Sequence, residues 1–515
     1  MKIYTNIVDF FYCRCNEYSD NIFIKNSNGI SYTYNDIKTI TLKTFNFLRK
    51  YEIKTDDKVS IILPNIPEYI PLLLGIFSHG GIAVNLNINF TPDEFKIRLS
   101  DADVSMVILT PELYHKIKDV LNELSIQKIL IVSNDTNNEE SIYNMDIINK
   151  ENSSLEVIIP DYNLSKIAFL QYTGGTTGGI KAAMLSHGNI LSNVSQIRKH
   201  FGDKLTESEE VMPATFPLYH VFALTFNIFS FFNIGATCLM YPVTKDLPLL
   251  IKLLKENKIT CFVGVNTLYK LLMQSSQLTK NDFPKLKICI GGGEHIQLNT
   301  KIEWEKLSGV PIYEAYGMTE TSAMAIVNPL NEYNDPETIG IPIPNTQVQL
   351  LDENNQVITN DNEHGEIVLK GPQVITQYWN KPTENETSFI NGWLRTGDIA
   401  VRKNGTYFKI VDRKKDMISV SGFKVFPNEV EAVITSFGGI NDCAVIGERD
   451  DQTGERVVLY YVAEDIIDQQ ALTEYCKKYL TAFKIPKKIY KVELIPKTAI
   501  GKTMRSSLRK LQESN

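Results

Sequence analysis

Short runs of apolar and β-branched residues alternate with longer helical patterns along the first third of the chain. The apolar runs cover residues 58–64, 104–110 and 128–133, and helix-like segments over residues 67–80 and 111–124 separate them. Strands that alternate with helices of this length are typical of a mainly parallel sheet. The pattern therefore predicts an α/β fold in this part of the chain.

The pattern changes after about residue 346. Two stretches that begin at Thr346 and Gly365 alternate apolar and polar positions around turn residues, which predicts a small antiparallel β-subdomain. A charged segment, residues 412–416, then precedes a compact tail with strand and helix patterns of its own. We predict a large N-terminal domain over residues 1–411 and a small, mobile α+β C-terminal domain over residues 412–515.

One apolar stretch, residues 221–241, has to be compared with a membrane span. A spanning helix requires roughly 20 predominantly apolar residues. Here Asn227, Ser230, Asn233 and Gly235 interrupt the run. The sequence therefore favours a buried helix followed by a strand.

Composition places the chain among globular proteins. Its 515 residues are 43% apolar and 22% charged, and the net charge is −7. Because no basic block is present, nucleic acid is not an expected partner. Asp9 and Arg14 interrupt the apolar start of the chain, which argues against a secretory signal. The seven cysteines are scattered apart from Cys13 and Cys15, and they predict reduced, mostly buried thiols in a cytoplasmic protein.

The segment over residues 171–190 carries the strongest chemical signal. An apolar run leads into it, and its turn holds Thr173, Gly174, Gly175, Thr176, Thr177, Gly178 and Gly179 before Lys181. Glycine lets backbone N–H groups converge on an anion, threonine hydroxyls add donors, and lysine adds positive charge. The segment predicts a phosphate-binding loop.

Two alternative explanations fit this loop less well. A Walker P-loop requires its lysine directly after the last glycine, but Ile180 stands there, and Ala182 follows Lys181 in place of a hydroxyl residue. A plain glycine-rich hairpin would explain a lone glycine cluster. A hairpin of this kind does not explain the presence of the three threonines and the lysine.

With QYTGGTTG at its start, the segment resembles the phosphate-loop signature of the adenylate-forming superfamily, and most of all that of the long-chain fatty acid–CoA ligases, or acyl-CoA synthetases. Ala182 is a departure, since the family usually has glycine there. Other matching motifs are EAYGMTET over residues 314–321, GWLRTGDIA over residues 392–400, and PKTAIGKTMR near the end. The resemblance covers nearly the whole chain and is densest after Gln171.

The resemblance implies ATP, Mg²⁺ and CoA as ligands and gives roles to single residues. It implies that Lys502, Lys181, His220 and Glu320 are catalytic, with Lys502 as the mobile cation of the adenylation step. Glu320 and Thr176 would hold the metal. Contacts with nucleotide or CoA, or a hinge role, are implied for Thr173, Gly174, Gly175, Thr176, Thr177, Gly178, Gly292, Gly293, Tyr316, Gly317, Thr319, Asp398, Arg413, Lys415 and Gly422.

The residue types suit these roles, although each has a simpler structural explanation. The carboxylate of Glu320 is a hard oxygen ligand of the kind that Mg²⁺ prefers, and Asp398 can accept both hydroxyls of a ribose. In isolation, EAYGMTET would be an ordinary helix start, and Asp398 would be a turn residue. A lone histidine such as His220 is more often structural than catalytic. The joint occurrence of the motifs favours the chemical explanation.

Two residues depart from the pattern of the long-chain ligases. His220 and the apolar residues after it are expected to border an acyl tunnel. Glu294 and His295, however, stand where these ligases typically have an apolar residue and proline. We expect these two residues to place polar groups at the wall of the pocket.

The implied function is activation of a medium- or long-chain fatty acid to acyl-AMP, followed by transfer to CoA. Transfer to an acyl carrier protein and a ligase for an aryl or short-chain acid are alternatives. A non-catalytic nucleotide-binding regulator is another, and the presence of Lys181, Glu320, Asp398 and Lys502 argues against it. The expected location is the cytoplasm, and peripheral contact with the inner face of the membrane is compatible with it.

Overall fold

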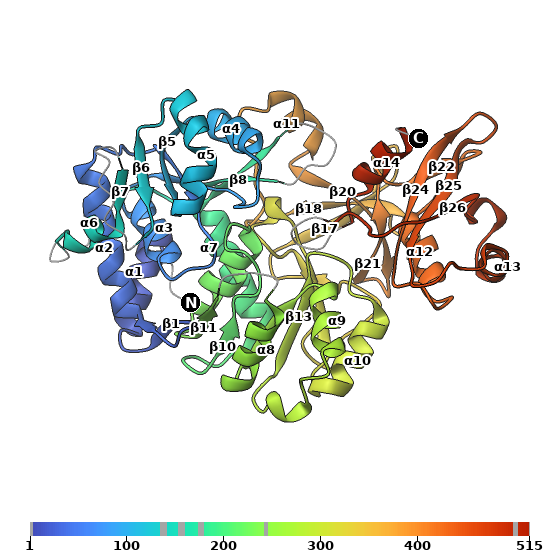
Figure 1. The fold of residues 1–515 in the computed structure, drawn as a ribbon, viewed down its shortest axis with the longest axis horizontal. Helices are drawn as coiled ribbons and strands as arrows, with labels where there is room; N and C mark the ends of the chain where they lie inside the picture. Colours follow the sequence, from blue (N-terminus) through green and yellow to red (C-terminus); the bar gives the residue numbers. More distant parts are fainter. Residues whose placement is uncertain are drawn as a thin grey trace.

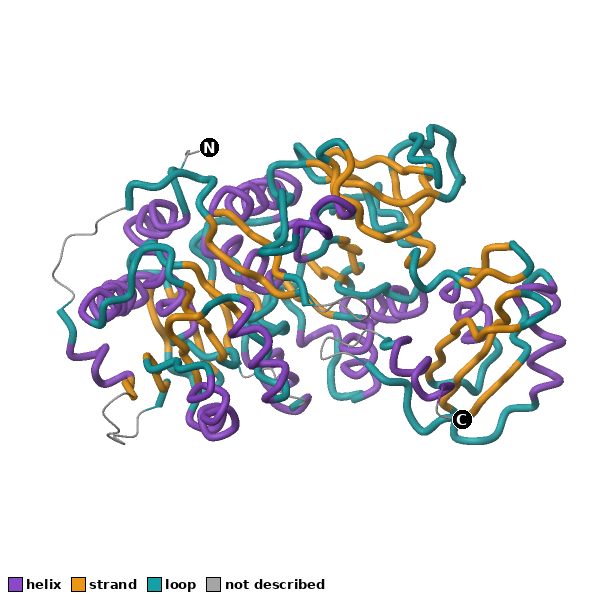
Figure 2. The backbone as a smooth tube through the Cα atoms, turned by 90° about the horizontal axis from the view of Figure 1, so that it is seen from above, coloured by secondary structure: helices purple, strands orange, loops and turns teal. Residues whose placement is uncertain are grey.

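A computed structural model describes residues 4–133, 142–152, 160–173, 180–241, 246–497 and 503–513. Within these segments the chain forms five sheets. The elements up to strand β21, which ends at Arg413, lie together, and strands β22–β26 form a smaller lobe at one end of the molecule (Figures 1 and 2). The fold is mixed α/β, with a large N-terminal multi-sheet domain and a small α+β C-terminal domain, as predicted.

The largest sheet has seven strands in the order β7-β6-β5-β3-β4-β8-β9, and every neighbouring pair is parallel except β8 and β9. Helices α4 and α5 pack into one apolar core of the sheet, and α1, α2, α3, α6 and α7 into the other. The strands are β3 (Lys58–Ile62), β4 (Ile82–Asn85), β5 (Val104–Leu109), β6 (Lys128–Ile131), β7 (Ile142–Asn144), β8 (Ile167–Tyr172) and β9 (Ala182–Ser186). The helices are α1 (Ile7–Glu17), α2 (Tyr34–Lys50), α3 (Tyr69–Ser78), α4 (Pro92–Asp101), α5 (Pro111–Glu123), α6 (Met145–Lys150) and α7 (His187–Phe201).

This sheet confirms the prediction of a mainly parallel arrangement. The three predicted apolar runs form β3, β5 and β6, and the two predicted helices form α3 and α5. Each of α4 and α5 begins with a threonine cap followed by proline, Thr91 for α4 and Thr110 for α5. Proline suits the first turn because the N–H that it lacks would have no partner within the helix.

Two further sheets complete the central part of the molecule. In the five-stranded sheet β12-β13-β14-β15-β16, the first three strands are parallel, and helices α8, α9 and α10 share an apolar core around the fully buried Trp304. Its elements are β12 (Cys261–Gly264), β13 (Ile288–Gly292), β14 (Ile312–Tyr316), β15 (Ile326–Val327), β16 (Ile341–Pro342), α8 (Leu247–Glu256), α9 (Asn266–Gln274) and α10 (Leu298–Ser308). A four-stranded sheet joins β1 (Ile22–Asn26), β2 (Ser31–Thr33), β10 (Val211–Pro213) and β11 (Thr237–Met240). Short 3₁₀ turns are η1 (Gly202–Lys204), η3 (Lys280–Asp282), η4 (Thr319–Thr321) and η5 (Ala482–Lys484).

The apolar stretch over residues 221–241 forms a buried helix and then strand β11, as predicted. The helix, η2 (Ala223–Ser230), is a π-helix, and all eight of its residues are buried. π-helical segments are rare and often lie near functional sites. Among the described residues, no helix is both long and apolar enough to cross a bilayer. All seven cysteines lie in described segments, none forms a disulfide, and only Cys13 is not buried, which confirms the expected state of the thiols.

The predicted antiparallel subdomain is also confirmed. Every neighbouring pair in its sheet is antiparallel. Its elements are β17 (Gln347–Leu351), β18 (Gly365–Lys370), β19 (Phe389–Ile390), β20 (Trp393–Lys403), β21 (Tyr407–Arg413) and α11 (Pro382–Ser388).

The C-terminal domain has a sheet and an apolar core of its own. Its elements are β22 (Ile418–Val420), β23 (Phe423–Val425), β24 (Asp442–Asp450), β25 (Gly454–Val462), β26 (Lys488–Lys491), α12 (Pro427–Thr435), α13 (Gln469–Tyr479) and α14 (Arg505–Glu513). The predicted boundary after residue 411 falls near the end of β21 and stays a prediction.

A buried asparagine fixes the segment that leads to His220. The Asn65 side chain donates to the carbonyl oxygens of Ala214 (3.1 Å) and Phe216 (2.9 Å) and accepts from the Leu218 backbone N–H (2.8 Å). Only 2% of Asn65 is exposed. The Asn65 amide uses both its donors and its acceptor. It thereby gives the backbone groups of this irregular segment the hydrogen-bond partners that they would otherwise find in a helix or strand.

Replacing Asn65 with alanine should therefore destabilise the protein. We expect N65A to lower the free energy of unfolding by about 2–4 kcal/mol, because it leaves buried carbonyl and N–H groups without partners. Urea unfolding measures the change. The exposed Asn299 on α10 gives the control, and N299A should change stability by no more than about 0.5 kcal/mol. Equal effects of the two substitutions would contradict the assigned role.

Candidate functional site

The two strands that flank the predicted phosphate loop are in place. Strands β8 and β9 are antiparallel neighbours, and the Thr173 backbone N–H donates to the Lys181 carbonyl oxygen at 2.9 Å. The predicted loop residues Gly174, Gly175, Thr176, Thr177 and Gly178 lie outside the described residues. Strands β8 and β9 thus bring Thr173 and Lys181 together. The phosphate contacts of the loop itself stay a prediction.

Lys181 and Glu320 meet on one aromatic side chain. The Tyr378 hydroxyl donates to Glu320 Oε1 at 2.8 Å, and Lys181 Nζ lies 5.4 Å from the centroid of the Tyr378 ring. Burial raises the pKa of Glu320 above its ordinary value, while the Tyr378 hydrogen bond and the positive charges of Arg413 and Lys181 oppose that rise. Thr319 precedes Glu320 in the short turn η4. Tyr378 itself was not predicted from the sequence.

A second cluster joins Tyr316, Asp398 and Arg413. The Tyr316 hydroxyl donates to Asp398 Oδ2, and Arg413 Nε pairs with Asp398 Oδ1, each at 2.6 Å. Asp398 on β20 and Arg413 on β21 are direct cross-strand partners. Burial would lower the pKa of Arg413, but Asp398, and to a smaller extent Glu320, raise it above its ordinary value. The two clusters are therefore close enough for their charges to interact.

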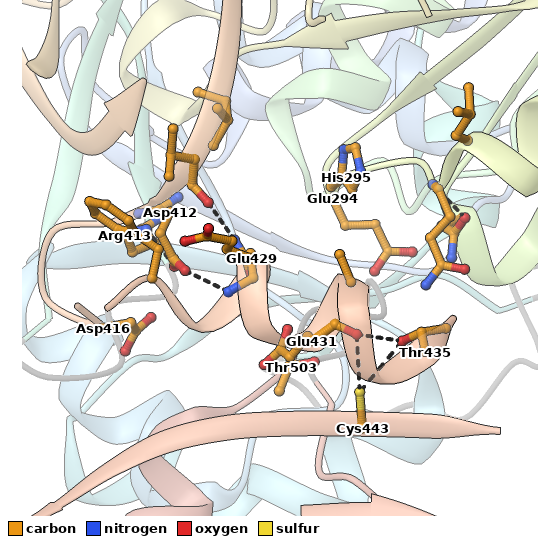
Figure 3. Close-up of a pocket in the computed structure, with 18 of the residues that line it drawn as sticks. Glu294, His295, Asp412, Arg413, Asp416, Glu429, Glu431, Thr435, Cys443 and Thr503 are labelled. Carbon is orange, nitrogen blue, oxygen red and sulfur yellow. Dashed lines mark hydrogen bonds between the residues drawn. The ribbon is translucent and has the colours of Figure 1, made fainter. Parts of the chain in front are cut away.

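A cavity of about 1770 Å³ lies between the large and small domains. Its lining includes Gly293, Tyr316, Gly317, Asp398, Arg413 and Lys415 among the predicted residues, and it does not include Lys181, His220, Glu320 or Gly422. Figure 3 shows Asp412 and Arg413 on one side, Glu294 and His295 on the other, and Glu431 and Thr503 of the C-terminal domain between them.

Three of the predicted glycines have structural reasons of their own. A Cβ on Gly317 would come within 1.7 Å of the Ala323 carbonyl oxygen, so only glycine fits there. Gly293 has a φ of +84°, a conformation that other residues rarely adopt. At Gly292, a Cβ would lie 3.0 Å from the Ala315 carbonyl oxygen. Close backbone packing therefore accounts for Gly317 and Gly292, and the positive φ accounts for Gly293.

Glu294 and His295 both line the cavity between the domains, and the protein itself uses their polar groups. Glu294 Oε1 accepts from the Thr267 backbone N–H at 3.2 Å in the first turn of α9, where negative charge is favourable. His295 Nδ1 lies 3.2 Å from Glu314 Oε1, and 69% of the histidine side chain is exposed. Glu314 also pairs with the buried Lys301 at 2.5 Å.

His220 lies in the turn before the π-helix, beside the ring of Tyr219. Its ring centroid is 4.9 Å from that of Tyr219, and the nearby Phe222 and Phe226 rings stack at 5.7 Å. The Gln171 side chain donates to the Tyr219 carbonyl oxygen at 2.9 Å. Because Gln171 lies in β8 just before Thr173, this bond ties the His220 turn to the strand that leads into the predicted phosphate loop.

On the side of the C-terminal domain, charged residues surround the predicted hinge. Burial raises the pKa of Asp412 to about 6, although the Arg505 charge opposes the rise. Arg505 donates to both carboxylate oxygens of Glu431, at 2.7 and 2.9 Å, and lies 3.8 Å from Asp416. Burial lowers the pKa of the neighbouring Lys415. These contacts hold the start of α14 against the segment that follows β21.

Gly422 and Lys502 are the two remaining predicted residues of this domain. Gly422 has a φ of +82° in the tight turn between β22 and β23, which is sufficient reason for glycine. Lys502 lies outside the described residues. The next residue in the chain, Thr503, lines the cavity.

The carboxylate of Glu320 suits a hard cation whose other ligands are phosphate oxygens and water. Among the described residues, no group of three or more histidine, cysteine or acidic side chains could hold a metal ion. Magnesium in phosphate-processing sites is commonly bound by one or two carboxylates, with phosphate oxygens and water completing its shell. A single buried carboxylate near Lys181 fits that arrangement.

Comparisons with known proteins place nearly the whole chain within one enzyme family. Residues 11–379 match the family of AMP-binding enzymes, and residues 429–502 match the AMP-binding enzyme C-terminal domain. The long-chain-fatty-acid–CoA ligase of Salmonella typhimurium is 33% identical over 98% of this chain and 94% of its own length. That of Bacillus subtilis is 31% identical over 95% of this chain and 91% of its own. ATP-bound MatB from Rhodopseudomonas palustris is 25% identical, with a TM-score of 0.90 over 99% of both chains.

The cluster around Asp398 gives a direct test of nucleotide binding. If Asp398 accepts the ribose hydroxyls, D398N should weaken AMP binding about tenfold or more, as expected for loss of hydrogen bonds to a charged group. It should weaken binding of 3′-deoxy-AMP much less, because that ligand lacks one of the hydroxyls. Isothermal titration calorimetry measures both affinities.

Asp361 provides the matched control for this substitution. It pairs with Arg402 Nε at 3.0 Å in another carboxylate–arginine contact, and it does not line the cavity. D361N should bind AMP like the unsubstituted protein. The ribose assignment would be wrong if D398N still distinguished AMP from 3′-deoxy-AMP as well as the unsubstituted protein does.

Proposed function

The chain belongs to the AMP-binding enzymes and is an adenylate-forming acid–CoA ligase, and on this premise we propose that its acid is a long-chain fatty acid. The meeting of Lys181 and Glu320 at Tyr378, beside the Asp398–Arg413 pair, supports the adenylation chemistry. The near full-length identity with two long-chain-fatty-acid–CoA ligases supports the choice of acid.

In the first step, a carboxylate oxygen of the fatty acid attacks the α-phosphorus of ATP. The bond from that phosphorus to the bridging oxygen breaks, pyrophosphate leaves, and acyl-AMP remains. The acid is already ionised, so no general base is needed. Catalysis then consists of positioning the reactants and stabilising the charge that develops on the phosphates.

We assign that stabilisation to residues on both sides of the site. Lys181, Thr173 and the loop residues 174–178 would contact the phosphates, and Lys502 would add positive charge from the C-terminal domain. Magnesium, held by Glu320 and Thr176, would neutralise charge on the phosphate oxygens when bound.

The rest of the nucleotide would lie along the wall of the cavity. Tyr316 would stack on adenine, and Asp398 with Arg413 would hold the ribose. Gly292, Gly293, Gly317 and Thr319 would contact the nucleotide or the acyl group. His220 would lie near the acid's carboxylate, with the apolar residues around Phe222 along its alkyl chain.

In the second step, the CoA sulfur attacks the acyl carbon of acyl-AMP. The thiol loses its proton, the bond from the acyl carbon to the AMP oxygen breaks, and AMP leaves with the thioester formed. Lys502, which stabilises departing pyrophosphate, has no part in this step, so the C-terminal domain would have to move it away from the centre. We assign Lys415 as the hinge of that movement and the turn at Gly422 as a contact for CoA.

The acid class is tested by ATP–pyrophosphate exchange over a series of acids. Saturated fatty acids of increasing length should show kcat/KM rising by about fourfold for each methylene that becomes buried. Aryl acids such as benzoate and short acids such as malonate should exchange poorly. Fastest exchange with an aryl or short acid would contradict a fatty-acid substrate while leaving the adenylation chemistry intact.

The role of Lys502 is tested by separating the two steps. K502A should slow pyrophosphate exchange by about 10²–10³-fold, the effect of removing one group that stabilises transition-state charge. It should largely spare thioester formation from supplied acyl-AMP and CoA. K478A, on the last turn of α13, is the control and should affect neither step. Equal loss of both steps in K502A would argue against a lysine that serves only adenylation.

A further inference from the structure

Tyr378 lies between two residues of the proposed site, Lys181 just before β9 and Glu320 in the turn η4. It belongs to the irregular segment between β18 and α11, and only 6% of it is exposed. Its hydroxyl donates to Glu320 Oε1 at 2.8 Å, and its ring lies 5.4 Å from Lys181 Nζ. One side chain thus contacts both the proposed metal ligand and the proposed phosphate-binding lysine.

Backbone bonds hold this tyrosine segment on both sides. The Trp379 backbone N–H donates to the Ala182 carbonyl oxygen at 2.9 Å, directly after Lys181 in the chain. On the other side, the Ile375 backbone N–H donates to the Glu320 carbonyl oxygen, also at 2.9 Å. The segment therefore spans from β9 to η4, and Tyr378 is fixed against both of its partners.

We infer that Tyr378 is a positioning residue that sets the orientation of the Glu320 carboxylate for magnesium and the place of the Lys181 ammonium for phosphate. This inference rests on the proposed function. The buried Glu320 carboxylate accepts one hydrogen bond from the Tyr378 hydroxyl at Oε1 and another from its own backbone N–H. The other oxygen is then directed as the metal ligand, in the way that hydrogen-bonded groups orient metal ligands in other proteins.

The ring of Tyr378 acts on the lysine separately. An ammonium within about 6 Å of an aromatic centroid is attracted by the negative face of the ring. A lysine side chain has four rotatable bonds, so a partner that restricts it lowers the entropy lost when phosphate binds. The hydroxyl and the ring therefore serve different partners, and substitutions can separate them.

A purely structural tyrosine is the alternative explanation. A buried hydroxyl usually needs a partner, and Glu320 would then be only that partner. In that case, removal of the hydroxyl would lower stability or weaken all ligand binding alike. A positioning role predicts a change confined to the part of ATP affinity that depends on magnesium.

The test is equilibrium binding of ATP by the full chain, measured by calorimetry with and without Mg²⁺ and with no acid present. Y378F should reduce the gain in ATP affinity that magnesium gives by about tenfold, as expected for loss of one hydrogen bond to a charged group. Affinity for metal-free ATP should stay unchanged, because the ring remains beside Lys181. Y378L, which removes the ring as well, should also weaken metal-free binding.

Tyr18 gives a matched control, because its hydroxyl donates to the Glu207 carboxylate at 3.2 Å in another part of the molecule. Y18F should bind ATP like the unsubstituted protein under both conditions. Thermal unfolding of each variant shows whether it is folded at the temperature of the titration.

A double substitution tests whether Tyr378 acts through Glu320. E320Q should itself remove most of the magnesium-dependent gain, and Y378F added to E320Q should then cause no further loss. The inference is overturned if Y378F keeps the full magnesium-dependent gain, if it weakens binding equally with and without the metal, or if its effect adds to that of E320Q. Failure of the unsubstituted protein to bind ATP at all would instead overturn the proposed function.

Discussion

A negative charge held inside the protein beside a positive one is the constraint on which the site depends. Burial alone would favour the neutral form of Glu320, and a neutral carboxyl is a poor ligand for a metal ion. The Tyr378 hydrogen bond and the charges of Lys181 and Arg413 oppose that effect. The proposed chemistry thus requires parts of three sheets to meet: the end of β14, the start of β9, and the β20–β21 pair that carries Asp398 and Arg413.

The cavity between the domains follows from where these elements end. Arg413 is the last residue of β21, and the C-terminal domain begins its own sheet at Ile418. Arg505 and Arg509 of α14 both pair with Asp416, so the helix that follows the predicted catalytic lysine is held close to the connection between the domains. Such an arrangement suits a reaction whose two steps need different groups at one centre.

The sequence predicts the architecture well because hydrophobic periodicity and turn residues are local signals. The runs at β3, β5 and β6 and the alternation after Thr346 were enough for the parallel and antiparallel sheets. The meeting of Tyr316, Asp398 and Arg413 came only from the resemblance to a family, because no spacing in the sequence brings residues of β14, β20 and β21 together. The π-helix was beyond prediction, since its residues have the composition of any buried helix.

Other parts of the site depend on contacts that no motif marks. Tyr378 and Asn65 lie in irregular segments, and their roles come from partners far away in the chain. Glu294 looked like a polar group offered to a ligand, yet it accepts a hydrogen bond from the start of α9. A side chain's use is decided by its neighbours, and these are known only once the chain is folded.

Analysis of the products of ATP turnover tests the chemistry most directly. Purified protein would be incubated with Mg²⁺, ATP, CoA and a long-chain fatty acid, and the nucleotides and phosphates separated by chromatography. Attack at the α-phosphorus predicts one AMP and one pyrophosphate for each thioester formed. Production of ADP and inorganic phosphate would contradict it, because the bond broken would then be the one to the γ-phosphate.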